Sequence, residues 1–228
     1  ASGIANMYAR DPAASVMGCN SLNALYGGRF VLGLGVSHAP LVSDVRGHEY
    51  KKPVATMRKY LEDMDLAWTA LGGAPPEKQT MLAALGPNMS ALAAEKTMGT
   101  FPYNITPAQV ALSRAAMGPE GKIVCEQKVC LTTDPVMARA AARGALAPYL
   151  PLPNYFKNWF RLGFNESDLE NGGSDQLMDA MVVWGSSEQI GETLSKYLEN
   201  GADQVVIQPI RPDGQPGIHW EALEALAK

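Results

Sequence analysis

RFVLGLGV, residues Arg29 to Val36, is an almost uninterrupted apolar run in a chain of 228 residues. Alternating apolar and polar residues would indicate a strand with one wet face, whereas a continuous run is typical of a strand buried on both faces of a parallel sheet. Further along, Val54, Met57 and Leu61 recur at helical spacing. Short apolar runs that alternate with longer amphipathic stretches predict parallel strands joined by crossover helices, which is an α/β fold.

Six strands, each followed by a helix, are predicted in this way. We expect the strands over residues 2–9, 29–36, 80–85, 100–105, 122–132 and 204–210. Proline is favoured in the first turn of a helix. Prolines therefore predict helices over residues 12–25, 107–117 and 135–146, and another that opens at residue 53. Further helices are expected over residues 89–96, 187–200 and from about 219, with chain breaks at 27–28 and 72–76.

The chain is expected to form one domain over residues 1–228, with an irregular insertion at 148–173. This segment has several prolines and an aromatic cluster, and we expect helical pieces packed on the outside of the domain. The aromatic residues either cover an apolar substrate or form a subunit interface, and the interface is favoured because dense aromatics are enriched there. The cluster comprises Tyr149, Tyr155, Phe156, Trp159, Phe160 and Phe164.

Two architectures suit six such units. A closed (β/α) barrel has eight units and about 250 residues. An open doubly wound sheet holds six strands, but the Gly-x-Gly-x-x-Gly fingerprint of its dinucleotide-binding members follows no strand of this sequence. Strand number alone therefore leaves the choice between them open.

Composition favours a small-molecule partner. The net charge is −4, 46% of the residues are hydrophobic and 18% are charged. The basic footprint that nucleic acid or an anionic membrane requires is missing, and no apolar run approaches the roughly 20 residues needed to cross a bilayer. Cys19, Cys125 and Cys130 are widely spaced, which predicts reduced cytoplasmic thiols and neither a disulfide framework nor a metal site.

Six motifs, in order, identify a family. They are SGIANMYARDPAA (2–14), GRFVLGLGVSHAPLV (28–42), RGHEYKKPVATMRKYLEDM (46–64), LAALGPNMSALAAEKTMG (82–99), VCLTTDPVMARAAAR (129–143) and LPNYFKNWFRLGF (152–164). Their sequence and spacing resemble the luciferase-like class of coenzyme F420-dependent oxidoreductases over nearly the whole chain. The resemblance implies a TIM barrel in which residues 2–9, 29–36, 80–85 and 204–210 are the third, fourth, fifth and eighth strands. The first two βα units, on the order of 60 residues, are then expected to be missing.

A deazaflavin cofactor needs a slot for its ring and an anchor for its anionic tail. The turn formed by Leu85, Gly86, Pro87, Asn88 and Met89 stands between a strand and a helix, and amides at a helix N-terminus bind phosphate. The alternative is that Gly-Pro only makes a tight turn. The resemblance places the cofactor tail at this turn.

The ring is expected beside the first predicted strand. The resemblance implies that Gly3, Ile4, Ala5 and Asn6 bulge against the deazaflavin, often through a non-proline cis peptide bond, with Gly3 allowing close approach. An apolar barrel strand that ends in Asn6 as a turn residue is an equally good interpretation.

The end of the second predicted strand supplies the candidate catalytic residue. Gly33 and Gly35 would leave room for a ring, and Ser37 and His38 could reach it; His38 could also donate a proton to a carbonyl substrate. The competing interpretation is a structural histidine. Val36 stands about where sugar-phosphate dehydrogenases of the wider class have a catalytic carboxylate, so that role does not carry over.

Other candidates are weaker. His48 is expected in a long loop that is solvated or covers the pocket, and His219 at the surface. Glu126 interrupts an apolar strand and is expected to need a partner or to line the barrel mouth. Met98-Gly99 and Phe101-Pro102-Tyr103 replace the Asp-Gly and His-Pro-Tyr of many relatives, which weakens the polar lining there.

The resulting functional prediction is an oxidoreductase that transfers a hydride between coenzyme F420 and an organic substrate. One alternative is a monooxygenase that uses flavin mononucleotide (FMN). Another is an inactive truncated remnant that acts as an interaction subunit. The expected partners are a small-molecule substrate and a second copy of the chain in a homo-oligomer, most simply a dimer; no nucleic acid, membrane or metal partner is expected.

Overall fold

The computed structural model describes residues 1–71 and 79–227. The predicted break at 72–76 lies outside these residues. The chain forms two compact units. Unit 1 comprises Ala1–Phe101 and Ala115–Lys122, and unit 2 comprises Pro102–Arg114 and the described residues from Ile123 onward.

Unit 1 is built on four parallel strands that pair in chain order: β1 (Ala5–Asn6), β2 (Leu32–Gly35), β3 (Thr80–Leu82) and β4 (Gly99–Thr100). The helices are α1 (Pro12–Leu25), α2 (Pro53–Ala70) and α3 (Pro87–Lys96), with short helical turns η1 (Met7–Ala9) and η2 (Pro40–Val45). Asp11 caps α1 by accepting a hydrogen bond from the Ala14 amide at 2.7 Å. The proline after this cap explains why the predicted start was correct.

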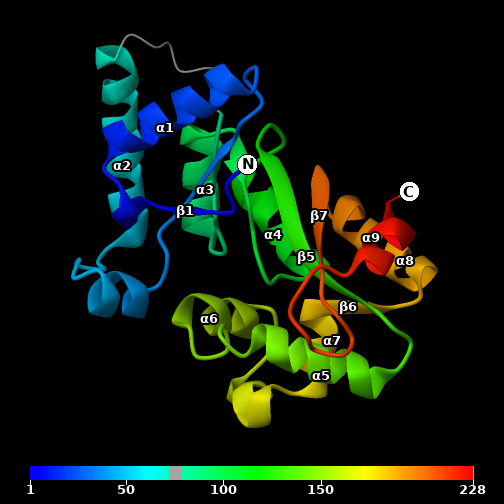
Figure 1. The fold of residues 1–228 in the computed structure, drawn as a ribbon. Helices are drawn as coiled ribbons and strands as arrows, with labels where there is room; N and C mark the ends of the chain where they lie inside the picture. Colours follow the sequence, from blue (N-terminus) through cyan, green and yellow to red (C-terminus); the bar gives the residue numbers. More distant parts are fainter. Residues whose placement is uncertain (72–78, 228) are drawn as a thin grey trace. The chain divides into compact units, whose positions relative to one another are not determined.

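The core of unit 1 lies between β2 and β3 and the inner faces of α1 and α2. Leu34, Met57 and Met64 are fully buried there. The helices α1 and α2 lie side by side (Figure 1), where the hydroxyls of Ser15 and Tyr60 are 2.6 Å apart. This packing holds the strands from one side and leaves their carboxyl ends to the loops.

Unit 2 contains β5 (Lys122–Leu131), β6 (Val182–Gly185) and β7 (Gln204–Pro209); β5 pairs in parallel with both of the others. Its helices are α4 (Pro107–Met117), α5 (Pro135–Leu146), α6 (Pro153–Arg161), α7 (Asp175–Met181), α8 (Ser187–Glu199) and α9 (Trp220–Leu226), with the turn η3 (Glu166–Gly172). α4 and β5 each have residues in both units. Tyr197 of α8 is buried, and its hydroxyl lies 2.6 Å from Oε1 of Gln127 on β5, so α8 covers one face of this sheet.

The parallel α/β arrangement is confirmed, but the strand list needs corrections. The described residues form seven strands and not the six that were predicted, and the additional strand is β6. Its four residues follow α7 directly, without a turn signal between them. The strand expected over 2–9 is reduced to Ala5–Asn6, since Asn6 caps η1 by accepting from the Tyr8 amide at 2.9 Å. The strand expected over 100–105 is reduced to Gly99–Thr100.

The segment 148–173, for which helical pieces were predicted, contains α6, and this helix buries one face. Trp159 is fully buried, and its Nε1 donates to the carbonyl oxygen of Asn104 at 3.0 Å. Tyr155 is also buried on the same helix. The helix forms because its aromatic residues recur at helical spacing and one face is buried within unit 2.

Candidate cofactor site

The predicted cofactor residues of unit 1 follow three neighbouring strands at the same edge of the sheet. Asn6 pairs with Gly35, and the Ala83 amide donates to the carbonyl oxygen of Leu34 at 2.8 Å. Because these strands are parallel, their carboxyl ends meet at one edge. Asn6, the Gly35–His38 segment and the turn before α3 therefore lie along this edge.

The turn at the end of β3 presents the N-terminus of α3. Gly86 is the N-cap in an extended conformation, Pro87 occupies the first turn, and no side chain caps the helix among the residues that the structure describes. The first amides of a helix lack intrahelical acceptors, so those of Asn88 and Met89 are left as donors at the positive end of the helix dipole. Pro87 and Asn88 are exposed. This end of the helix therefore has the free amides and the positive dipole end that bind anions in other proteins.

Met89 and Leu85 take part in this turn differently from Asn88. The Met89 side chain is buried in the unit 1 core, so only its backbone faces the turn. Leu85 is half-buried and directly precedes the Gly86 cap. The predicted tight turn is therefore present, and it leaves amides available as well.

The segment before β1 packs closely on β2. The Gly33 amide donates to the Ser2 hydroxyl at 3.0 Å, and that hydroxyl donates to the Gly33 carbonyl oxygen at 3.0 Å. A Cβ on Gly33 would lie 1.9 Å from the Ser2 carbonyl oxygen, and one on Gly35 would lie 2.6 Å from Cδ1 of Ile4. These two glycines make room for the neighbouring chain segment, which occupies the space that we expected a flat ring to use.

The open side of this segment is at Gly3. The Gly3–Ile4 peptide bond is cis, as the family resemblance implied. Gly3 is exposed, and the atom nearest to a Cβ built on it is Cε1 of Phe101 at 3.8 Å. A flat group has access to the backbone here, beside Ala5 and Asn6 at the strand end.

Asn6 has a buried donor without an acceptor. Its Oδ1 accepts from the Tyr8 amide, and its Nδ2 is buried with no hydrogen-bond partner among the described residues. A buried amide hydrogen that is left unpaired is costly, and such groups usually have a partner. A bound carbonyl oxygen would supply that partner.

Ser37 and His38 follow Gly35 at this edge. Ser37 has a left-handed backbone (φ 57°), and its carbonyl oxygen accepts from the Tyr50 hydroxyl at 3.2 Å. His38 is half-buried, and burial lowers the pKa of its imidazole below 6.5. The ring is therefore neutral at pH 7 and can both donate and accept a hydrogen bond.

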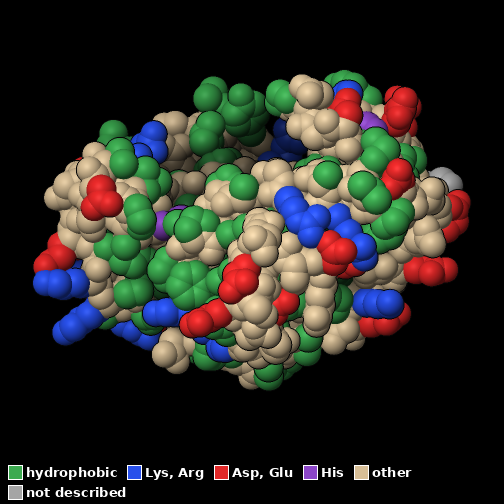
Figure 2. Space-filling view, turned by 90° about the horizontal axis from the view of Figure 1, so that it is seen from below, with side chains coloured by type: hydrophobic (Ala, Val, Ile, Leu, Met, Phe, Trp, Pro, Cys, Tyr) green, Lys and Arg blue, Asp and Glu red, His purple; other side chains and the backbone are tan. Residues whose placement is uncertain are grey.

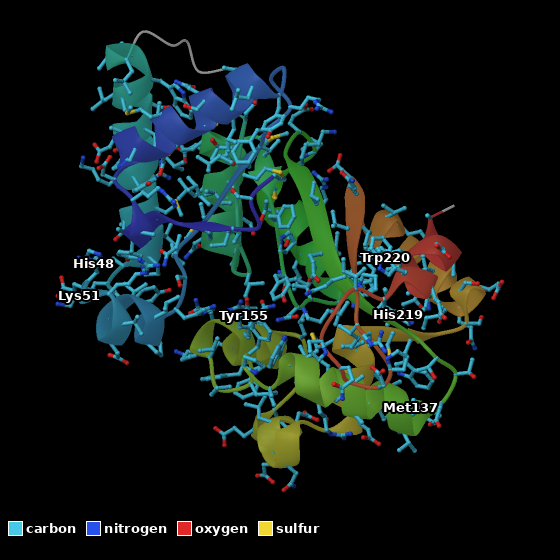
Figure 3. All side chains as sticks on the ribbon, in the orientation of Figure 1. His48, Lys51, Met137, Tyr155, His219 and Trp220 are labelled. Carbon is cyan, nitrogen blue, oxygen red and sulfur yellow. The ribbon has the colours of Figure 1, made fainter. Side chains whose placement is uncertain are left out.

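The other predicted histidines differ in exposure. His48 is exposed on the segment before α2, near Lys51 (Figure 3), and its ring centroid is 6.0 Å from that of Tyr8. Tyr8 is an aromatic neighbour that the sequence analysis missed, although it stands only two residues after Asn6. The prediction that His219 lies at the surface is wrong: His219 is 9% exposed at the start of α9 in unit 2.

The predicted aromatic cluster divides within unit 2. Tyr149 and Tyr155 have ring centroids 5.1 Å apart, and Tyr155 packs on Trp159 at 6.0 Å. Tyr155 and Trp159 are thus buried within their own unit, which leaves them unavailable for a subunit interface. Phe156 and Phe160 remain partly exposed.

Charges on the molecular face drawn in Figure 2 are mixed in sign, with acidic side chains beside basic ones. Between α5 and α7, Arg139 forms ion pairs with Asp175 and Asp179 at 2.8 and 2.6 Å. Within residues 1–71 and 79–227, no helix is long and apolar enough to span a membrane, and no group of acidic, histidine or cysteine residues is arranged to hold a metal ion.

These features define a parallel α/β protein with an uncapped helix N-terminus at the carboxyl edge of its strands. The family model for the luciferase-like monooxygenases matches residues 1–204, and the chain belongs to this family. A Mycobacterium tuberculosis protein named "Putative coenzyme F420-dependent oxidoreductase Rv3520c" is 29% identical over an alignment 266 residues long. The alignment includes gaps and covers 90% of this chain and 77% of that protein.

Two solved structures share the fold. The coenzyme F420 dependent tetrahydromethanopterin reductase of Methanopyrus kandleri has a TM-score of 0.75 at 18% identity, covering 99% of this chain and 80% of its own. The oxygenating constituent of 3,6-diketocamphane monooxygenase from Pseudomonas putida, solved with FMN, has a TM-score of 0.70 at 15% identity, covering 99% and 77%. The predicted fold class, a TIM barrel of the luciferase-like type, is confirmed.

Proposed function

We propose that this chain is an oxidoreductase that transfers a hydride between coenzyme F420 and a small organic substrate. The observation that best supports it is the combination, at one sheet edge of unit 1, of an uncapped helix N-terminus with a strand end that has a buried, unpaired donor. The first feature suits an anionic tail, and the second suits a ring with carbonyl oxygens. The Mycobacterium tuberculosis relative and the Methanopyrus kandleri reductase, both named for coenzyme F420, point to the same cofactor.

The residues of unit 1 fit a deazaflavin. The amides of Asn88 and Met89 would hold a phosphate of the tail, with Leu85, Gly86 and Pro87 shaping the turn. The backbone from Gly3 to Ala5 would lie along the ring, and Nδ2 of Asn6 would donate to a ring carbonyl. When bound, the deazaflavin supplies hydride chemistry at a ring carbon.

His38 is the proposed acid/base residue. Because burial lowers its pKa, the imidazole is neutral and has a lone pair on one ring nitrogen. It can therefore accept a proton from an alcohol substrate, or donate a hydrogen bond through its other ring nitrogen. Ser37, held by its left-handed backbone and by Tyr50, sets the direction in which the chain leaves β2.

A second candidate function is that of a monooxygenase that binds FMN. The Pseudomonas putida enzyme of the same fold was solved with FMN, although the shared fold by itself does not favour this cofactor. The helix N-terminus would accept the single phosphate of FMN equally well, so the two cofactors differ here in the length of tail beyond the first phosphate.

Titration of the purified chain with each cofactor, followed by cofactor fluorescence, tests the proposal. We expect saturable binding of coenzyme F420 that is at least tenfold tighter than that of FMN. Tighter binding of FMN would favour the monooxygenase, and binding of neither would favour a non-catalytic chain and contradict the proposal.

A further inference from the structure

A buried acid and a buried base lie on one face of β5 in unit 2. Successive residues of a strand point to opposite faces. Gln127 faces α8, where it meets Tyr197, so Glu126 and Lys128 take the opposite face. On the adjacent β7, Val206 pairs with Glu126 and Gln208 with Lys128, which places these side chains on that same face.

The carboxylate of Glu126 lacks the hydrogen bonds that burial normally requires. Glu126 is 8% exposed, and neither of its oxygens has a hydrogen-bond partner among the described residues. The nearest cation is Nζ of Lys128, 3.7 Å from Oε2, which is an ion pair but too long for a hydrogen bond. Two acceptor positions on a buried carboxyl group are therefore unfilled.

Lys128, in contrast, is held firmly by its surroundings. Its Nζ donates to Oδ1 of Asn104 at 2.7 Å and lies 3.7 Å from the centroid of the Tyr103 ring, which is a cation–π contact. The Tyr149 ring lies 5.5 Å away on the same side. Lys128 is thus fixed as the positive neighbour of Glu126 and is not free to swing closer to it.

The electrostatics of this pair make the carboxyl group a proton exchanger. Burial raises the pKa of Glu126 and lowers the pKa of Lys128, and each partner opposes the shift of the other. The rings of Tyr103 and Tyr149 lie against Lys128, and burial raises the pKa of the Tyr103 and Tyr155 hydroxyls, so those two stay neutral at pH 7. A carboxyl group with a raised pKa can donate to a ketone oxygen as the acid and accept from an alcohol as the carboxylate.

The neighbouring strand leaves this face open. The residues of β7 alternate between exposed and half-buried, and Gln204, Val206 and Gln208 are the exposed ones. Oε1 of Gln208 lies 3.4 Å from the Tyr103 hydroxyl, so the open strip continues to the tyrosines beside Lys128. A small molecule could approach Glu126 along β7 without displacing a helix of unit 2.

We propose that Glu126 and Lys128 form a binding site for the hydroxyl or carbonyl group of a small, largely apolar organic molecule. The oxygen of the ligand meets Glu126, and its apolar part lies on Val206 and the tyrosine edges. This inference goes beyond the proposed function, because the site is defined by residues of unit 2 alone.

The test uses benzyl alcohol as the probe and toluene, which lacks the oxygen, as the matched control compound. In protein labelled at the glutamate side-chain carboxyl carbon, the carbon-13 signal of Glu126 is assigned by its loss in Glu126→Gln. We expect benzyl alcohol to shift this signal saturably and toluene to leave it in place. If Glu126→Gln does not fold, Glu126→Asp supplies the assignment, because it keeps a carboxyl group and lacks the label.

Variants then separate this site from the cofactor site. Glu126→Gln should weaken benzyl alcohol binding at least tenfold while leaving coenzyme F420 binding unchanged. Glu95→Gln, at an exposed ion pair with Arg58 on unit 1, should change neither. A Glu126 signal that ignores the alcohol, or that responds equally to toluene, would overturn the inference. A shift seen in a chain that fails to bind coenzyme F420 would uphold this site and reject only the proposed function.

Discussion

The side chain of Ile4 lies over Gly35, where a Cβ would come within 2.6 Å of Cδ1 of Ile4. At Gly33 the corresponding obstacle is the carbonyl oxygen of Ser2, at 1.9 Å. The two glycines thus hold the segment that contains the cis Gly3–Ile4 bond against β2. The proposed ring site depends on this segment staying in place.

Alanine at these two positions should therefore have unequal effects. The end of the Ile4 side chain can move, so Gly35→Ala should cost about 1 kcal/mol of unfolding free energy. The Ser2 backbone cannot move without shifting β1, so Gly33→Ala should cost about 3 kcal/mol or more. Urea unfolding measures both. Gly18→Ala is the control, because nothing lies within 4 Å of its Cβ and alanine is the better helix former. Equal costs at 33 and 35 would contradict the packing described.

Asn6→Asp isolates the unpaired donor. The variant keeps an oxygen that can accept from the Tyr8 amide and removes Nδ2. We expect coenzyme F420 affinity to fall about tenfold or more, since a ring carbonyl would lose its donor and face a carboxylate. Asn6→Ala should also lose the cap and about 1 kcal/mol of stability. Undiminished affinity in Asn6→Asp would show that Nδ2 does not contact the cofactor.

Glu126 should make stability depend on pH. Burial raises its folded-state pKa from 4.5 to about 7, so the folded chain holds a proton that the unfolded chain releases. This contribution is present below pH 4.5 and is lost as the pH rises through about 7. Relative to Glu126→Gln, the wild type should lose stability across that window. Denaturant midpoints at several pH values measure this difference, and a constant difference would refute it.

His38 should act in the opposite direction. Burial lowers its pKa below 6.5, so the unfolded chain takes up a proton more readily than the folded chain. Its contribution is present above pH 6.5 and is lost as the pH falls through the folded-state pKa. The wild type should therefore lose more stability on acidification than His38→Gln. Parallel acid profiles for the two proteins would show that the imidazole is not buried as described.

Local rules predicted the helices of this chain better than its strands. A capping residue followed by proline located α1 and α5, because those interactions are made by adjacent residues. β4 has only two residues, which is too short for a recognisable apolar pattern. β6 follows α7 without a turn residue between them, so its start is not visible in the sequence. Strand ends depend on pairing with distant residues, which sequence patterns alone do not report.

Residues of the candidate site were predictable to different degrees. The turn at Gly86 followed from residue types, whereas the cis bond at Gly3 came only from the family resemblance. Glu126 stood out as a charge in an apolar strand, but its partner Lys128 was missed. Residues two apart in a strand point to the same face, so the sequence could have predicted that Lys128 lies beside Glu126. His219 was misplaced because its burial depends on packing within unit 2.

We propose that the N-terminus of α3 holds the anionic tail of coenzyme F420, and the variants Asn88→Asp and Asn88→Ala together test this. A carboxylate in the first turn should stabilise the helix by about 0.3–1 kcal/mol, because it complements the helix dipole. The same carboxylate should repel an anionic tail. In a fluorescence titration we predict that Asn88→Asp binds coenzyme F420 at least tenfold more weakly, while Asn88→Ala stays within about twofold of the wild type. If Asn88→Asp binds the cofactor as tightly as Asn88→Ala does, the tail is not held at this helix.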